Sequence, residues 1–292
     1  MRKAAQASRI TRRQACVAIT GALGGALVVP AVHAAPPVTF GLTPVFLDSD
    51  IVLVGQIEAY LTARLDRTVT VVKRRTYREV TALLLAAQLD AAWICGYPFV
   101  QHRAALEVLA VPSYLGAPLY RSYLIVRRDR AASGLADLNG DIHAFSDPDS
   151  NSGFLVTRAA LAAMHAAPAG FFARSFFTYG HRNVIRAVAA GLAQSGSVDG
   201  YVWDVMADIE APLVGATRVI AKSAPMGFPP VAAARGGDAG LRRAIRQALL
   251  AMPGDLTGRN ILSTLRLDGF TEADPALFAS IEAMWLSTRD AG

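Results

Sequence analysis

Short apolar runs alternate with amphipathic stretches along most of this chain. The runs have the length of buried strands and end at turn residues, whereas the amphipathic stretches repeat their apolar positions at helical spacing. The first five predict strand, helix, strand, helix and strand over Val38–Leu42, Ile51–Leu65, Val69–Val72, Tyr77–Leu89 and Asp90–Cys95, with Asp48 or Ser49 capping the first helix. This alternation with short links predicts right-handed parallel strand–helix–strand units and an α/β fold.

The second half of the chain repeats this arrangement. It predicts strands over Tyr123–Val126, Ile142–Phe145, Val198–Trp203 and Arg218–Ala221, and helices from Phe154 onward and over Val184–Ala190, Leu241–Met252 and Pro275–Leu286. In each half a helix precedes a Leu/Val-Asp step and a strand that carries a tryptophan, an echo that shared α/β physics alone would also produce. We expect two lobes, over residues 35–118 and 119–217, with residues 218–292 returning to the first lobe and a ligand held between them.

Residues 1–34 predict an export signal. Five basic residues precede an apolar run over Ala15–Val29, and Val32-His33-Ala34 fits signal-peptidase cleavage after Ala34. Thr11–Gln14 resembles a twin-arginine signal, although Ala15-Cys16 replaces the usual bulky pair, so Sec export stays open. No apolar lipobox precedes Cys16, which argues against a lipoprotein. We expect a periplasmic protein.

Removing residues 1–34 changes the charge balance. That segment holds five basic and no acidic side chains, which leaves 24 basic and 23 acidic residues in the other 258. A near-neutral chain gives nucleic-acid binding no compositional support. The five histidines are scattered and Cys95 is the one cysteine left, so we expect no disulfide, no metal site and no cofactor.

The segment Asp147–Gly153 carries the most informative chemistry. It follows a predicted strand and precedes a predicted helix, so that four small residues stand at a helix start: Ser150, Asn151, Ser152 and Gly153. The first N–H groups of a helix lack partners there, and hydroxyls beside a glycine let an anion approach closely. Ser and Asn are also the usual helix caps after an Asp-Pro turn. The segment therefore predicts an anion site, a cap, or both in one geometry.

Further candidate side chains follow predicted strands, at the edge where parallel sheets bind ligands. They are His181, Tyr97, Tyr201 and Asp204. His181 opens a helix and could donate to an anion, more strongly if its imidazole is charged, or could solvate the helix start as a loop histidine. The tyrosines offer hydroxyl donors or wall packing. Asp204 offers an acceptor for a protonated oxyanion or an amine, or caps the next helix.

Enzymatic chemistry finds little support in the sequence. A Ser152–His181–Asp204 triad can be written, but the glycines that flank the nucleophilic serine of hydrolases are absent. A lone Cys95 in an apolar strand favours packing over thiolate chemistry, and Trp93 and Trp203 favour core positions. We expect a binding protein and no enzyme.

Four segments together carry a resemblance to known proteins: Asp90–Val100, Leu135–Gly140, Phe145–Gly153 and His181–Asn183. They resemble one family, the phosphate/phosphite/phosphonate substrate-binding proteins of ABC transporters. The resemblance implies a two-lobed type II periplasmic binding protein fold, whose cleft closes on a small oxyanion for delivery to a membrane ABC permease. It implies that His181 donates to the anion and that the anion is held by Ser150, Asn151, Ser152 and Gly153. We expect a monomer.

The chain departs from this family's pattern at one position. Phe99 stands where relatives often carry tyrosine, which removes a hydroxyl donor that Tyr97 could replace. A similar fold serves periplasmic oxyanion sensors that signal to a membrane histidine kinase, including arsenite sensors with a cysteine ligand. Cys95 therefore keeps sensing as the alternative to uptake.

Overall fold

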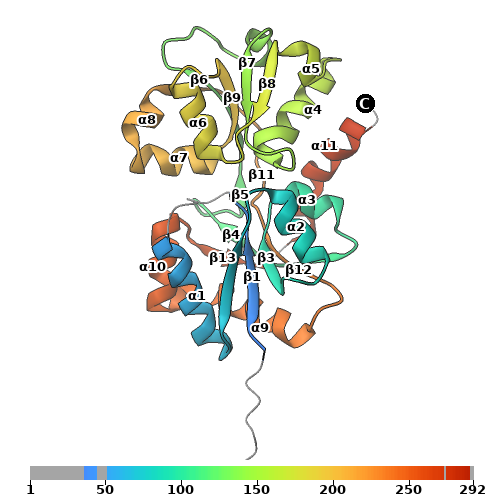
Figure 1. Ribbon diagram of the computed structural model, residues 1–292, viewed down its shortest axis with the longest axis vertical. Helices are drawn as coiled ribbons and strands as arrows, with labels where there is room; N and C mark the ends of the chain where they lie inside the picture. The colour runs from blue at the N-terminus through green and yellow to red at the C-terminus, as the bar shows by residue number, and fades with distance from the viewer. Residues whose placement is uncertain (1–35, 45–50, 273, 290–292) are drawn as a thin grey trace, which may run out of the picture. The chain divides into compact units, whose positions relative to one another are not determined.

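The computed structural model describes residues 36–44, 51–272 and 274–289. The predicted export signal and the predicted caps Asp48 and Ser49 lie outside these residues. Two mixed β-sheets organise the described part of the chain (Figure 1). We call each sheet with its helices a lobe.

The six-stranded sheet of lobe 1 has the order β13-β4-β12-β3-β1-β2. Its strands are β1 (Val38–Leu42), β2 (Val69–Lys73), β3 (Ala91–Trp93), β4 (Leu106–Ser113), β12 (Val231–Ala234) and β13 (Gly269–Thr271). Its helices are α1 (Ile51–Leu65), α2 (Tyr77–Leu85), α3 (Gly96–Gln101), α9 (Ala239–Leu250), η3 (Met252–Gly254) and α10 (Leu256–Leu265).

The five-stranded sheet of lobe 2 has the order β10-β6-β9-β7-β8. Its strands are β6 (Ser122–Arg127), β7 (Ile142–Phe145), β8 (Arg174–Phe177), β9 (Ser195–Asp199) and β10 (Thr217–Lys222). Its helices are η1 (Leu135–Leu138), η2 (Asn151–Leu155), α4 (Val156–Ala163), α5 (Pro168–Phe171), α6 (His181–Ala189), α7 (Gly200–Ile209) and α8 (Ala211–Gly215).

Three segments connect the lobes. The short strands β5 (Leu119–Tyr120) and β11 (Met226–Gly227) pair antiparallel where the chain leaves lobe 1 and returns to it. After η4 (Pro275–Phe278), helix α11 (Ala279–Arg289) contacts both α3 of lobe 1 and α4 of lobe 2. None of the helices in the described ranges is both long and apolar enough to cross a membrane.

The hydrophobic pattern located most elements but misplaced some. β10 still pairs with β6, so the second sheet extends past the predicted boundary at residue 217. The predicted strand Val198–Trp203 is wrong, because β9 ends at Asp199 and Trp203 lies on helix α7; the echo between the two tryptophan strands therefore fails. The predicted helix Tyr77–Leu89 ends at Leu85. The sheets are also mixed: strands β4, β6, β10, β12 and β13 run antiparallel to their neighbours.

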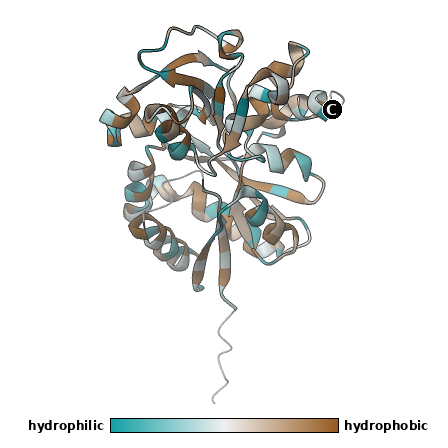
Figure 2. Ribbon diagram, turned by 45° about the horizontal axis from the view of Figure 1, so that its top comes forward, coloured by the Kyte–Doolittle hydropathy of each residue, from teal (hydrophilic) through white to brown (hydrophobic). Residues whose placement is uncertain are grey.

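The strand register sets where the ligand edge lies. In lobe 1, Leu42 at the end of β1 faces both Lys73 of β2 and Trp93 of β3, so the carboxyl ends of these three parallel strands coincide. In lobe 2, Phe145 and Phe177 end β7 and β8 at one level. Apolar residues concentrate on the strands (Figure 2), and the strands are largely buried. Polar residues are therefore left to the loops at the carboxyl ends of the strands.

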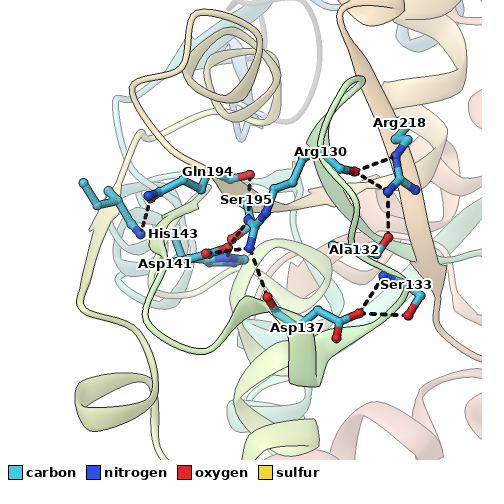
Figure 3. A network of polar contacts seen from close by, with 10 residues as sticks. Arg130, Ala132, Ser133, Asp137, Asp141, His143, Gln194, Ser195 and Arg218 are labelled. Atoms are coloured by element: carbon cyan, nitrogen blue, oxygen red, sulfur yellow. Dashed lines mark hydrogen bonds and ion pairs between the residues drawn. The ribbon is translucent and has the colours of Figure 1, made fainter.

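A polar network fixes the opposite end of β7 (Figure 3). Arg130 pairs with the buried carboxylate of Asp141, its Nη2 lying 2.7 Å from Oδ1, and donates to the carbonyl oxygens of Asp137 and Gln194 at 3.0 and 3.2 Å. Arg218 donates to the carbonyl oxygens of Arg130 and Ala132. The network ties the loop before β7 to β9 and β10, and so anchors the strand that leads into Asp147–Gly153.

We expect Arg130→Ala to destabilise the protein by about 2–3 kcal/mol, because it leaves the Asp141 carboxylate buried and unpaired. The control is Arg127→Ala, which breaks an exposed pair with Asp129 and should leave the unfolding midpoint close to that of the wild type. Urea denaturation of both variants measures the difference. Equal midpoints for the two would show that the buried pair contributes nothing.

Candidate functional site

The four predicted anion-binding residues form one buried turn. Ser150, Asn151 and Ser152 are at most 1% exposed and Gly153 is buried with them. We call the turn formed by Ser150–Gly153 the cradle. Ser150 Oγ accepts from the Gly153 N–H at 3.0 Å, so the predicted cap is present. Leu155 N–H donates to the Ser150 carbonyl at 3.0 Å, five residues back. This wide π-type turn differs from the expected α-helical start, and such turns frequently occur at functional sites.

Asn151 joins the cradle to lobe 1 and to the connecting strands. Its N–H donates to Cys95 Sγ at 3.2 Å, and its Nδ2 donates to the hydroxyl of Tyr120 on β5 at 2.8 Å. Its Oδ1 is buried and has no hydrogen-bond partner. An orphaned buried acceptor is costly in a protein interior, which indicates a place where a ligand with a donor hydrogen completes the site.

His181 begins α6 as predicted, but it is a neutral donor. Its Nδ1 accepts the backbone N–H of Asp199 at 3.0 Å, which places the ring hydrogen on Nε2. That nitrogen lies 3.2 Å from the hydroxyl of Tyr77, so His181 donates and the Tyr77 hydrogen is left for another acceptor. Burial lowers the pKa of His181 to about 3. The stronger, charged form considered from the sequence is therefore absent at neutral pH.

Asp199 places a carboxylate beside Ser152 and His181. It caps α7, its Oδ1 accepting the N–H of Tyr201 at 2.9 Å, while its Oδ2 has only a long contact of 3.4 Å from the hydroxyl of Ser152. Burial raises the pKa of Asp199 to about 7. A carboxylate that is short of donors beside the cradle favours a ligand that carries a proton or an amine.

Gly153 is required by the space around it. A Cβ at this position would lie 1.8 Å from Ser146 Oγ and 3.0 Å from the Cε1 of His181. Ser146 Oγ is itself buried without a hydrogen-bond partner. Close approach of Ser146, the cradle and His181 therefore depends on the missing side chain.

The structure does not bring every predicted residue to the cradle. Tyr201 donates its hydroxyl to the carbonyl of Leu265 at 2.6 Å. Tyr97 lies on α3, where burial raises the pKa of its phenol. The contribution of these two tyrosines to binding stays a prediction.

Asp204 lies away from the helix start at which it was expected. It occupies the second turn of α7 and accepts the hydroxyl of Tyr123 at 3.0 Å. The expectation that it caps the helix was wrong, because the helix begins five residues earlier and Asp199 is the cap. The triad Ser152–His181–Asp204 is not assembled, since the Nδ1 of His181 is occupied by the N–H of Asp199.

Cys95 is a packed thiol at the junction of the lobes. It is 2% exposed and accepts the N–H of Asn151. Burial raises its pKa to about 12, so the thiol is protonated and is a poor ligand for soft metals or metalloids.

Three residues that contact the cradle or His181 were not predicted from the sequence: Tyr77, Tyr120 and Asp199. Tyr77 follows Thr76, whose hydroxyl forms a reciprocal capping box with Glu79 at the carboxyl end of β2. The same helix-start argument that selected the cradle therefore applied to Tyr77. Asp199 was hidden inside the wrongly extended strand, although Asp-Gly is a strong signal for a strand end.

Comparison with known proteins now adds to this geometry. A family model described as the periplasmic phosphonate-binding proteins of ABC transporters matches residues 40–278. The chain belongs to that family. This phosphonate-binding family member is thus a periplasmic protein that captures a small-molecule solute for a membrane ABC importer. The family is a class of transport proteins, and it favours uptake over the sensor alternative.

Solved structures share the fold at low sequence identity. A binding-protein component of an ABC phosphonate transporter from Pseudomonas aeruginosa matches with a TM-score of 0.80 at 18% identity, over 88% of this chain and 87% of that one. PhnD1 from Prochlorococcus marinus, in complex with methylphosphonate, matches with 0.77 at 17% identity, over 87% and 98%. A histidine kinase sensor domain matches with 0.56 at 16% identity, over 82% and 99%. These neighbours identify a type II periplasmic binding fold with two lobes.

Proposed function

We propose that the solute is a small phosphorus oxyanion, a phosphonate, phosphite or phosphate, held between the cradle and Tyr77. The observation that carries the proposal is the meeting of neutral donors from both lobes at one buried point. They are the Tyr77 hydroxyl from lobe 1, whose oxygen accepts from His181 Nε2, and the cradle from lobe 2. Several such donors must replace water together, because desolvating an anion is costly. The helix start adds a favourable dipole.

Two hydrogen-bond acceptors beside the cradle narrow the choice of anion. Asp199 Oδ2 and Asn151 Oδ1 lack good donors, so the ligand supplies an O–H or N–H hydrogen to them. Phosphorus oxyanions carry such a hydrogen near neutral pH as monoanions, and 2-aminoethylphosphonate carries an ammonium group as well. Sulfate and selenate are unprotonated dianions, which a buried carboxylate repels.

The remaining details of this proposal follow from the sequence. The chain is exported by a signal that is cleaved after Ala34, and the exported form works as a monomer without catalysing a reaction. The near-neutral charge of residues 35–292 supports the absence of nucleic-acid partners.

Calorimetric titration across oxyanions tests the function. We expect micromolar or tighter binding, about −8 kcal/mol or better, for at least one of phosphate, phosphite, methylphosphonate and 2-aminoethylphosphonate. Sulfate and selenate should bind at least about 100-fold more weakly. Binding of sulfate alone, or of none of the six, would overturn the proposal.

A further inference from the structure

The segment Asp147–Asp149 of lobe 2 contacts the first turn of helix α2 in lobe 1. Asp147 is 1% exposed, and its Oδ2 accepts the backbone N–H of Tyr77 at 3.3 Å. Two residues on, Asp149 receives Arg78 through both Nε and Nη2, at 3.2 and 3.4 Å. Both contacts therefore join one turn of lobe 1 to one segment of lobe 2.

This segment is stiff and leads directly into the cradle. Asp147 Oδ1 accepts the N–H of Asp149 at 2.8 Å, and the Asp147 carbonyl accepts the N–H of Ser150 at 3.0 Å. Pro148 lies between the two aspartates and fixes its own φ. A shift of α2 relative to this segment is therefore transmitted to the turn that holds the anion.

The charges of this segment oppose the proposed ligand. Two carboxylates lie within three residues of the cradle, and each repels an approaching anion. Lobe 1 supplies what offsets them, since the start of α2 carries partial positive charge and Arg78 a full one. These groups reach the aspartates only when the lobes are in contact.

We propose that Asp147 and Asp149, with Arg78 and the start of α2, form a charge-compensated latch that couples anion retention to lobe closure. With the lobes apart, the aspartates are uncompensated and slow anion entry. With the lobes together, they are compensated, and the contact slows anion release. The inference rests on the proposed anion function of the cradle. Asp149 and Arg78 also line a surface groove, where solvent keeps the pair weak and reversible.

Stopped-flow binding of methylphosphonate tests the latch with Arg78→Gln, Asp149→Asn and the double variant. We expect each single change to speed release about two- to fivefold, as for an exposed ion pair, and the double variant to match the singles because the pair is lost once. Asp149→Asn should also speed entry about twofold at low salt, and Arg78→Gln should slow it. Asp147→Asn should speed release further, because an amide has one acceptor oxygen and cannot accept both the Tyr77 and the Asp149 N–H groups.

The matched control is Arg127→Gln, which breaks the exposed pair with Asp129 inside lobe 2 and should leave both rates unchanged. The latch alone would be overturned if the Arg78 and Asp149 variants had wild-type rates. It would also be overturned if the effects on release in the two single variants added up in the double variant. Failure of the wild-type protein to bind any phosphorus oxyanion would overturn the proposed function, and the latch with it.

Discussion

Gly153→Ala should weaken phosphonate binding by roughly 10- to 100-fold. The added methyl group would lie 1.8 Å from Ser146 Oγ and 3.0 Å from His181 Cε1, so either the cradle or the histidine must move. Overpacking of this kind costs about 1–3 kcal/mol, and each 1.4 kcal/mol is tenfold in affinity. Calorimetric titration with methylphosphonate measures the loss.

Two variants show whether that loss has the stated cause. Ser146→Gly combined with Gly153→Ala removes the nearest atoms and should recover most of the binding, since Ser146 Oγ has no partner to lose. Gly55→Ala changes an exposed glycine of α1 with open space around it and should leave binding unchanged. Wild-type affinity in Gly153→Ala would mean that anion binding does not depend on the conformation of the cradle.

Tyr77→Phe should weaken binding by about 10- to 100-fold while keeping the fold. The change deletes a buried hydroxyl whose hydrogen is left over once His181 Nε2 donates to its oxygen. Hydrogen bonds to charged groups contribute about 1.5–3 kcal/mol, which corresponds to that loss of affinity. Calorimetry on the purified variant, with circular dichroism as a check of folding, provides the measurement.

Tyr60→Phe is the matched control for the loss of a buried hydroxyl. Tyr60 is 2% exposed in lobe 1 and donates to the carbonyl of Ala248 at 2.5 Å, far from the cradle. Its loss should lower stability by about 1 kcal/mol and leave affinity unchanged. If Tyr77→Phe and the wild type had equal affinities for the anion, the Tyr77 hydroxyl of lobe 1 would not contact it.

The fold was predictable wherever the apolar period was unambiguous. Val38–Leu42, Ile51–Leu65 and Ile142–Phe145 have the bounds that the pattern predicted, because short apolar runs between turns and long amphipathic stretches differ clearly in period. Val198–Trp203 misled the pattern because Tyr201, Val202 and Trp203 continue an apolar run through a helix start. There the decisive signal is local capping by Asp199, which hydrophobicity does not report.

The antiparallel strands of lobe 1 were harder to predict than those of lobe 2. β4, over Leu106–Ser113, was missed altogether, and it pairs with β12 and β13 from more than a hundred residues away. Strand–helix alternation predicts parallel neighbours, and it carries no information on returning strands. Helix α3 was missed because the turn-like residues Gly96 and Pro98 lie in its first turn, and α10 was missed because Pro253–Asp255 precede it.

The candidate site divides in the same way. The cradle and His181 could be predicted because each stands at a helix start, a feature of a few consecutive residues. Their meeting with Tyr77 could not, since it joins residues 104 positions apart across two lobes. The charge state of His181 was also beyond the sequence, because burial and the Asp199 N–H set it.

A crystal structure of the exported chain with methylphosphonate bound tests the central claim most directly. The account predicts that the phosphonate oxygens lie within hydrogen-bond distance of Tyr77 Oη and of the hydroxyl or N–H of Ser152, with one oxygen toward Asp199, while His181 Nε2 still donates to Tyr77 Oη. The account would be contradicted if methylphosphonate were bound elsewhere, for example against surface arginines, with no contact to the cradle.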